Sequence, residues 1–388
     1  MHSSATINLV QTPIIPVVNE WIRTHPDTLS LGQGMVAYPP PASALAAIAN
    51  FGKQAEQHYY SQAWGEPALL DLIKAKLSAE NGIDTERYAL MITAGSNMAF
   101  LNILLAIVDA GDEIILPVPY YFNQEMAIRL LHCQPVCVAT DENYQLNIEA
   151  LRAAITPKTR AIVTVSPNNP SGAVYSQASL RAVNALCADY GLYHISDEAY
   201  EYFVYDDAQH FSAASISDAQ AHTITLYSLS KAYGFASWRL GYVLFPKQLR
   251  QPLLKVQDTN LICPPLITQY AAIGALQAGF SYCQGQQRPL IKARCEVLAH
   301  LASLGSLVQL IPTQGAFYVL LKVNCALDDM NLVQRLITEF KVAVIPGRAF
   351  GLTAGCYVRI SYGMLNADLL PLALTRLITG LRLLCQKT

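Results

Sequence analysis

Between about residues 90 and 245 the chain alternates short apolar, β-branched runs with helix-like stretches such as SQASLRAVNALCADY (176–190). Apolar runs of this length are typical of strands that are buried on both faces of a parallel sheet. The runs are EIILP (113–117), RAIVTVS (160–166), LYHISD (192–197), TITLYSL (223–229) and GYVLF (241–245). This alternation predicts an α/β fold with a mostly parallel sheet flanked by helices.

Three of these runs end in polar clusters: SPNN (166–169), SDE (196–198) and SLSK (228–231). In open α/β sheets the ligand site lies outside the carboxyl ends of the strands. We therefore expect these three clusters, which are far apart in the sequence, to meet at one edge of the sheet.

The C-terminal third has a different pattern. A helical stretch at 285–304 precedes strand-like GAFYVLLKV (315–323) and CYVRISYG (356–363), and a final amphipathic helix follows. The first 35 residues show little regular pattern. We expect a large domain at 36–290 and a smaller α+β domain formed by the two chain ends, 1–35 and 291–388.

Composition narrows the class of protein. Of the 388 residues 52% are hydrophobic and only 14% are charged, and an oligomer interface is a natural place to bury such an excess. The formal net charge of -2 predicts no general attraction to nucleic acid or to an acidic membrane surface. We therefore expect substrates to be recognised by individual charged side chains.

Three features of the sequence predict the cellular compartment of the protein. The N-terminus lacks a basic segment followed by an apolar one, so we expect no secretory signal. Apolar stretches such as ILLAIV (103–108) are far below the roughly 18 residues that span a bilayer. The nine cysteines are scattered and odd in number, which favours reduced thiols. Together these features predict a cytoplasmic protein that does not bind membranes.

Several common motifs are absent, among them GxxxxGK[ST], HExxH and GxSxG. GQGMVA (32–37) matches the GxGxxA form of the dinucleotide fingerprint, but YPPP follows it directly. A true fingerprint opens a helix, and a proline run does not continue one. A dinucleotide site is therefore not expected.

The segment SLSKAYGFASWRLG (228–241) holds the most informative chemistry. Lys231 stands just past a strand end, between hydroxyl groups, and Arg239 follows eight residues later. An amine can form a Schiff base with an aldehyde, while hydroxyls and a guanidinium bind phosphate. The arrangement suits a phosphorylated aldehyde, although a solvated lysine is the commoner explanation of SxSK alone.

This segment resembles the lysine motif of the class I and II pyridoxal-phosphate aminotransferases of fold type I. Other parts of that family's pattern appear in order from about residue 25 to the end. They are YSQAWG (60–65), TAGSN (93–97), SPNNPSG (166–172), DEAY (197–200), PGRAFG (346–351) and VRIS (358–361). The combination is specific, and it implies pyridoxal 5'-phosphate (PLP) as the cofactor.

The resemblance implies a role for each matched residue. Asp197 pairs with the pyridine nitrogen of the cofactor, Asn169 and Tyr200 bind its phenolic oxygen, and Tyr121 stacks on its ring, with Tyr120 as the open alternative. The phosphate is bound near the start of a helix. The residues implied there are Gly95, Ser96, Asn97, Ser228, Ser230, Arg239 and, from the neighbouring subunit, Tyr60.

The substrate side is implied in the same way. Arg359 and Asn169 bind the substrate α-carboxylate, and Gly34 lies where a Cβ would crowd it. Lys231 holds the cofactor and, once released, moves the α-proton, so that an amino acid and a 2-oxo acid react in two ping-pong half-reactions. The shared Tyr60 implies a homodimer.

Two features of the sequence bear on the preferred amino acid. In one branch of the family an arginine reads the side-chain carboxylate of aspartate, and the ungapped position here is Asp258. Stretches such as PYYFN (119–123) resemble aromatic and methionine aminotransferases, and Tyr38, Trp64 and Tyr121 could line an aromatic pocket. We expect an aromatic amino acid or methionine.

Three alternatives stay open to different degrees. Aspartate with 2-oxoglutarate is the first, and a C–S β-lyase on the same scaffold is the second, since it would use the same residues. A PLP-sensing transcription regulator would need a basic DNA-binding region ahead of the matched segment. Only about 25 residues precede it here, and they are not basic.

Overall fold

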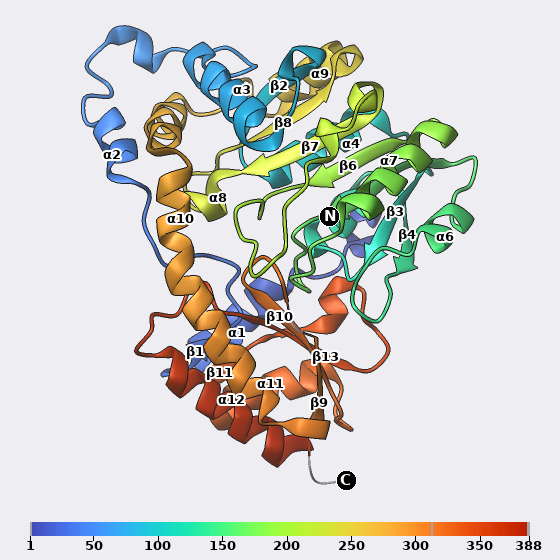
Figure 1. Cartoon of the computed structure of the whole chain (residues 1–388), viewed down its shortest axis with the longest axis vertical. Coiled ribbons are helices and arrows are strands. Elements are labelled where there is room, and N and C mark those ends of the chain that lie inside the picture. The colour runs from blue at the N-terminus through green and yellow to red at the C-terminus, as the bar shows by residue number, and fades with distance from the viewer. Residues whose placement is uncertain (1, 312, 386–388) are drawn as a thin grey trace.

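The computed structural model describes residues 2–311 and 313–385, and it contains one large sheet and one small sheet side by side (Figure 1). The large sheet has seven strands in the order β2-β8-β7-β6-β5-β3-β4. Their bounds are β2 (Tyr88–Thr93), β3 (Glu113–Val118), β4 (Gln134–Ala139), β5 (Thr159–Val165), β6 (Tyr193–Asp197), β7 (Thr223–Ser228) and β8 (Gly241–Pro246). β8 runs in the direction opposite to the other six strands, so the predicted mostly parallel sheet is confirmed.

Helices cover both faces of this sheet, because successive residues of each strand point to opposite sides. On β3, for example, Ile114 and Leu116 join one buried cluster and Ile115 joins another. One face is covered by α4 (Ser96–Ile107), α5 (Phe122–Leu130) and α9 (Arg250–Asn260), and the other by α3 (Pro67–Asn81) and α7 (Gln177–Tyr190). The shorter helices are α2 (Ala42–Ile48), α6 (Ile148–Ala153) and α8 (Leu229–Ala232). Apolar runs without polar alternation are thus explained by burial on both faces.

The small sheet is antiparallel, in the order β12-β13-β10-β9. Its strands are β9 (Val308–Leu310), β10 (Tyr318–Val323), β12 (Ile345–Pro346) and β13 (Cys356–Ser361), and a separate parallel pair joins β1 (Leu29–Ser30) to β11 (Val342–Ala343). The helices around it are α1 (Ile14–Thr24), α10 (Leu266–Ala302), α11 (Asp329–Phe340) and α12 (Leu370–Cys385). The two predicted C-terminal strands and the final helix are therefore confirmed.

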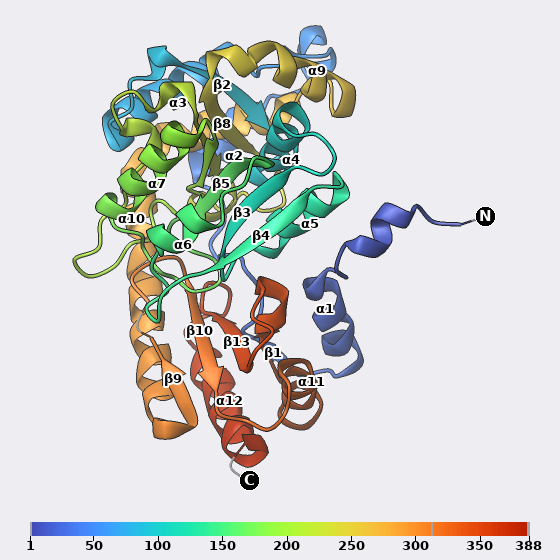
Figure 2. The same ribbon diagram turned by 90° about the vertical axis from the view of Figure 1, so that its right-hand side faces the viewer.

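The N-terminal segment has more structure than its pattern predicts. Residues Ile14–Thr24 form α1, which packs against α11 and β12 of the small sheet region. A short 3-10 helix, η1 (Ala5–Leu9), lies near the end of α5, where the Thr6 hydroxyl and Nε2 of His132 are 2.8 Å apart (Figure 2). The N-terminal segment thus spans from the small sheet region to the helix layer of the large sheet.

Helix α10 connects the two sheets and bends at Gly279, whose φ of 65° is not helical. A glycine adopts this left-handed conformation without a steric penalty. The predicted domain boundary at residue 290 falls inside α10, and the division into 36–290 and 1–35 plus 291–388 stays a prediction.

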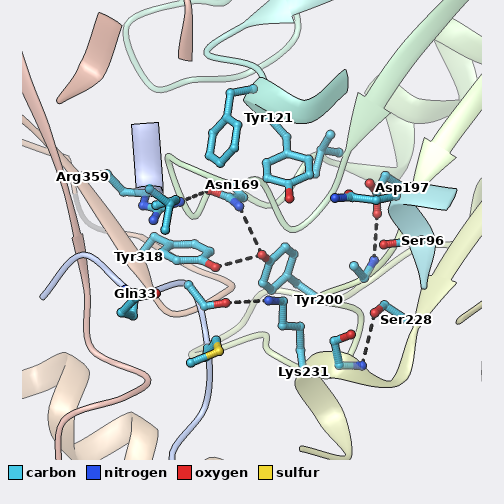
Figure 3. A pocket seen from close by; sticks show the side chains of 18 of the residues that line it. Gln33, Ser96, Tyr121, Asn169, Asp197, Tyr200, Ser228, Lys231, Tyr318 and Arg359 are labelled. Atoms are coloured by element: carbon cyan, nitrogen blue, oxygen red, sulfur yellow. Dashed lines mark hydrogen bonds between the residues drawn. The ribbon is translucent and has the colours of Figure 1, made fainter. Parts of the chain in front are cut away.

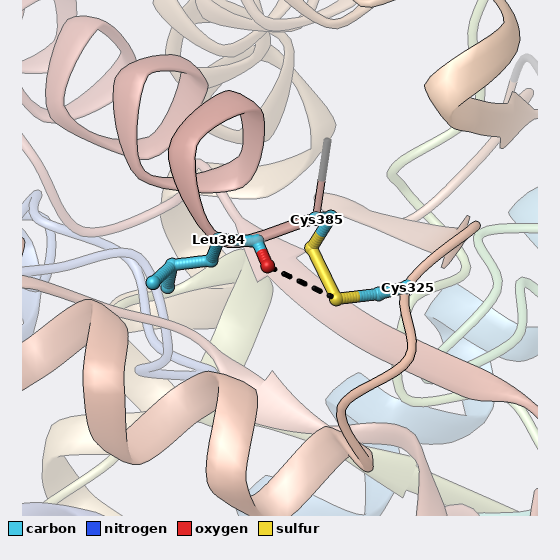
Figure 4. Close-up of a disulfide and its surroundings, with 3 residues drawn as sticks. All are labelled: Cys325, Leu384 and Cys385. Atoms are coloured by element: carbon cyan, nitrogen blue, oxygen red, sulfur yellow. Dashed lines mark hydrogen bonds between the residues drawn. A yellow bond between two sulfur atoms is a disulfide. The ribbon is translucent and has the colours of Figure 1, made fainter. Parts of the chain in front are cut away.

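The sulfur atoms of Cys325 and Cys385 form a disulfide that joins the loop after β10 to the end of α12 (Figure 4). The prediction that all nine cysteines are reduced thiols is therefore wrong for this pair. The sequence did not indicate the pair, because the two cysteines are separated by 60 positions. The contact between the segment after β10 and the end of α12 was not predicted. The remaining seven cysteines are free.

Residues 2–311 and 313–385 contain neither a membrane-spanning helix nor a cluster of metal ligands. No helix there has the length and apolar character needed to cross a membrane. No group of three or more His, Cys, Asp or Glu side chains is arranged to hold a metal ion.

Candidate active site

A cavity of about 210 Å³ lies where the carboxyl ends of the large-sheet strands face the small sheet (Figure 3). Most residues predicted for the site line it, namely Gly34, Ser96, Asn97, Tyr121, Asn169, Asp197, Tyr200, Ser228, Ser230, Lys231, Arg239 and Arg359. They come from β6, β7, β13, the starts of α4 and α8, and five connecting segments. The predicted convergence of the three polar clusters at one sheet edge is thus observed.

Lys231 lies in the short helix α8, which begins where β7 ends. The Ser228 hydroxyl caps this helix by accepting a hydrogen bond from the Ser230 backbone N–H at 3.2 Å. The Lys231 ammonium donates to the carbonyl oxygen of Gly34 at 2.5 Å. Burial lowers the pKa of Lys231 to about 8, with smaller contributions from the positive charges of Arg359 and Arg239. An amine with this pKa can accept and return a proton near neutral pH.

The rim next to Lys231 is built to bind an anion. Gly95 begins α4 with φ 84° and offers no side chain to cap the helix, so the first N–H groups of α4 face the cavity rim without a cap. Arg239 lies against it, and a Cβ at Gly95 would come 2.5 Å from Nη2 of Arg239. None of the salt bridges within residues 2–311 and 313–385 involves Arg239. A guanidinium beside helix amides suits a phosphate group.

Asp197 ends β6 inside the cavity. Its carboxylate accepts hydrogen bonds from Nε2 of Gln124 at 3.0 Å and from the backbone N–H of Ala199 at 3.2 Å. Burial raises the pKa of Asp197 to about 6, and the negative charge of Glu198 raises it further, against these two hydrogen bonds. A buried carboxylate of this kind is stabilised by a cationic partner, and a protonated ring nitrogen would be one.

Arg359, on β13, is 2% exposed and its guanidinium has no carboxylate partner in the part of the chain that the structure describes. Its Nη1 donates to Oδ1 of Asn169 at 2.9 Å and its Nη2 donates to the Gly32 carbonyl at 2.7 Å. Its buried Nε finds no acceptor within the described residues. A buried cation without a counter-ion is costly, so this end of the cavity is suited to an incoming carboxylate.

The hydroxyl of Tyr200 stands between the two charged ends of the cavity. Nδ2 of Asn169 donates to it at 3.2 Å, and the hydroxyl of Tyr318 lies 2.8 Å away. Tyr318 was not predicted as a site residue. Its strand was recognised, but Tyr318 belongs to none of the segments that carry the family resemblance, and no local pattern indicates a role for it.

The two tyrosines considered for stacking on the cofactor ring lie in different surroundings. Tyr121 lines the cavity, where Nδ2 of Asn123 donates to its hydroxyl at 2.9 Å. Tyr120 is buried in the helix layer, and its ring is so close to Gly351 that a Cβ there would come within 2.6 Å. The geometry therefore favours Tyr121 over Tyr120.

Two predicted residues do not line the cavity of this single chain. Gly95 contributes through its contact with Arg239. Tyr60 is 80% exposed and lies in a surface hollow beside Tyr59 and Cys263. Sequence reasoning also missed several other lining residues, namely Ile15, Gln33, Met35, Phe122, Val165 and Ala199.

The residues present fit PLP. The anion-binding rim at Gly95 and Arg239 matches a phosphate, the raised pKa of Asp197 matches a ring nitrogen that carries a proton, and Lys231 provides a half-buried amine with a lowered pKa. The unpartnered Nε of Arg359 remains for the carboxylate of a substrate.

Comparisons with known proteins agree with this assignment. The model of the family "Aminotransferase class I and II" matches residues 26–377. An aspartate aminotransferase of Pyrococcus abyssi is 33% identical over 371 residues, covering 93% of this chain and 94% of that protein. An aromatic-amino-acid aminotransferase of Thermococcus litoralis is 33% identical over 343 residues, covering 86% and 87%. The solved structure of Thermus thermophilus aspartate aminotransferase with maleate has a TM-score of 0.90 at 30% identity, covering 98% of this chain and all of that one.

Proposed function

The chain belongs to the class I and II aminotransferases, which are PLP-dependent, and from this premise we propose that its preferred amino donor is an aromatic amino acid or methionine. The enzyme moves the amino group of an L-amino acid to a 2-oxo acid. The observation that carries the assignment is the meeting of a half-buried amine, Lys231, with a buried carboxylate, Asp197, and a buried guanidinium without a carboxylate partner among the described residues, Arg359, in one cavity.

The roles of the residues follow from their positions. PLP supplies an aldehyde that joins an amine and a ring that stabilises negative charge at the α-carbon of the amino acid. Lys231 would hold that aldehyde and then move a proton through Nζ. Asp197 would keep a proton on the ring nitrogen, and Asn169 and Tyr200 would bind the phenolic oxygen. Arg359 would hold the carboxylate of the amino acid or the 2-oxo acid, beside Gly34.

The donor preference rests on charge. The cationic side chains among the described residues that line the cavity are Lys231, Arg239 and Arg359, and each already has a role. Asp258 lies exposed on α9 and offers no cation for a side-chain carboxylate. The rest of the lining includes Ile15, Met35 and Phe122, which suit an apolar side chain. Some relatives are named for aspartate and others for aromatic amino acids, so aspartate with 2-oxoglutarate is the alternative pair of substrates.

A homodimer with shared active sites is part of the same proposal. Tyr60 is largely exposed in the single chain, as expected for a side chain that serves the phosphate of a neighbouring subunit. A Tyr60→Phe variant should weaken cofactor retention without changing the oligomeric state. Location in the cytoplasm stays a prediction from the sequence.

The first test is a single half-reaction. Purified protein loaded with PLP is mixed with one amino acid at a time, without a 2-oxo acid, and the absorbance of the cofactor is followed. We expect phenylalanine, tryptophan, tyrosine or methionine to convert the cofactor to its aminated form faster than aspartate does.

The other outcomes are equally informative. Conversion by aspartate alone would keep the aminotransferase and overturn the donor preference. Unchanged absorbance, with pyruvate and ammonia released from a sulfur amino acid, would identify the β-lyase instead.

A further inference from the structure

Tyr318 and Arg359 lie on one face of the small sheet. In the antiparallel pair β10–β13, Tyr318 is opposite Ser361 and Leu320 is opposite Arg359, so Tyr318 and Arg359 are diagonal neighbours with side chains on the same side. The centre of the Arg359 guanidinium lies 4.7 Å from the centroid of the Tyr318 ring. Tyr318 is fully buried. The ring therefore forms one wall of the Arg359 site.

The Tyr318 hydroxyl reaches across to the large-sheet side of the cavity, where it meets the Tyr200 hydroxyl at 2.8 Å (Figure 3). Tyr200 has one proton and two lone pairs on its oxygen. Which partner donates to which decides where the Tyr200 proton points.

The amide of Asn169 settles half of this question. Its Oδ1 accepts from Nη1 of Arg359, so its Nδ2 must face Tyr200 and donate to the Tyr200 oxygen. One lone pair of Tyr200 is thereby used, which leaves one lone pair and the proton.

Arg359 settles the other half. Burial raises the pKa of both hydroxyls, to about 12 for Tyr318 and well above the ordinary value for Tyr200. The positive charge of Arg359 lowers both pKa values, and it acts mainly on Tyr318, because the guanidinium lies 4.7 Å from the centroid of the Tyr318 ring, so Tyr200 is the weaker acid. The more acidic hydroxyl is the better donor. Within residues 2–311 and 313–385 the Tyr318 hydroxyl also has no other hydrogen-bond partner than Tyr200.

We propose that Tyr318 is a positioning residue: it donates to Tyr200 and so forces the Tyr200 proton to point into the cavity, toward the phenolic oxygen of the cofactor. With Asn169 and Tyr318 both donating to it, the Tyr200 oxygen has no lone pair left and its proton can only be donated onward. Hydrogen bonds in such a chain strengthen one another. This inference rests on the proposed function, since it assigns a donor for PLP.

The test is the pH dependence of the cofactor absorbance in the loaded enzyme. A donor to the phenolic oxygen stabilises its negative charge, and this lowers the pKa of the neighbouring nitrogen that links the cofactor to Lys231. Tyr318→Phe keeps the ring against Arg359 and removes only the hydroxyl. We expect the midpoint of the absorbance titration to rise by about half to one pH unit, the equivalent of one hydrogen bond.

A double-mutant cycle separates this role from simple packing. If Tyr318 acts only through Tyr200, the midpoint of Tyr200→Phe/Tyr318→Phe should equal that of Tyr200→Phe alone. Phe350→Leu is the matched control, because the Phe350 ring also lies against Arg359, 5.1 Å from the guanidinium centre, without touching Tyr200. It should raise KM for the amino acid and leave the midpoint where it is.

Two results would overturn the inference. The first is a Tyr318→Phe variant whose absorbance titration has an unshifted midpoint and whose KM is raised as in Phe350→Leu. Tyr318 would then only form one wall of the Arg359 site. Additive shifts in the double variant would show that Tyr318 does not act through Tyr200. Failure of the proposed function would look different, because the unmodified protein would then bind no PLP or would not aminate it.

Discussion

The two ends of the cavity are built in different ways. The sheet end, consisting of Ser96, Asp197, Ser228, Lys231 and Arg239, comes from the edge of one sheet and the short segments that follow its strands. The carboxylate end, consisting of Gly34, Asn169, Tyr318 and Arg359, is assembled from four segments that are far apart in the sequence and belong to both sheets. The sheet end therefore depends on local turns and caps, and the carboxylate end depends on how the two sheet regions meet.

This difference predicts that damage to one end leaves the other intact. Variants of the sheet end should lose chemistry while the substrate carboxylate is still bound. Variants of the carboxylate end should keep the cofactor and lose substrate binding.

The largest effect is expected for Lys231→Ala. Among the described residues that line the cavity, Lys231 is the only one with an amine that can both hold the cofactor and move the proton, so turnover should fall by at least ~10³-fold. Cofactor absorbance and turnover are the measurements, with binding of a non-reacting carboxylate as the control. Turnover close to that of the unmodified protein would contradict the assignment of Lys231.

Arg359→Lys should follow. The ammonium keeps the charge but cannot form two parallel hydrogen bonds with a carboxylate, and kcat/KM should fall by ~10²-fold, mainly through KM. The absorbance of bound PLP should be retained. If the variant instead loses PLP, the two ends are not independent.

Asp197→Asn tests the sheet end without cofactor. Because the pKa of Asp197 is raised from 3.8 to about 6 in the folded protein, the folded state binds the proton more tightly than the unfolded state. Its carboxylate therefore destabilises the apoprotein progressively as pH rises from about 4 to 6, by about 3 kcal/mol at and above pH 6. Thermal unfolding of the apoprotein should show the variant more stable than the original at pH 7 and equal to it near pH 4. Equal stability at both pH values would show that the site does not penalise the charged carboxylate.

The smallest effect is expected for Gly34→Ala. A Cβ at this position would lie 2.8 Å from the Tyr318 hydroxyl, so KM should rise ~10-fold. Tyr318→Phe removes that oxygen and should restore part of the loss in the double variant. Steady-state kinetics of the single and double variants measure this, and no recovery would mean that the clash lies elsewhere.

Sequence alone predicted the sheet end better than the carboxylate end. Lys231, Asp197 and Arg239 follow buried strands or lie in one short motif, so their convergence follows from the rule for parallel strands. Arg359 was found only through resemblance, since nothing near it in the sequence indicates a missing counter-ion. Tyr318 was missed because its role comes from its register with β13 and not from its neighbours.

The elements of the fold also differ in how well the sequence predicted them. Five of the seven strands of the large sheet were predicted closely, namely β3, β5, β6, β7 and β8, because burial on both faces gives a continuous apolar run. Helix α1 was not predicted: only Ile14 and Val18 of its 11 residues are buried, and its packing against α11 and β12 stabilises it. The Cys325–Cys385 pair was missed because pairing depends on tertiary contact, which spacing does not reveal.

That disulfide closes a covalent ring of chain that contains β12, β13 and therefore Arg359. The loop before β13 is exposed at Thr353, Ala354 and Gly355, and it is a natural place for a protease to cut. A cut there would leave two fragments that run as one band on a gel until a reductant is added. The nicked enzyme would still carry its substrate-binding arginine, held covalently by one sulfur–sulfur bond and otherwise by the pairing of β13 with β10 and β12 and by the packing of α12.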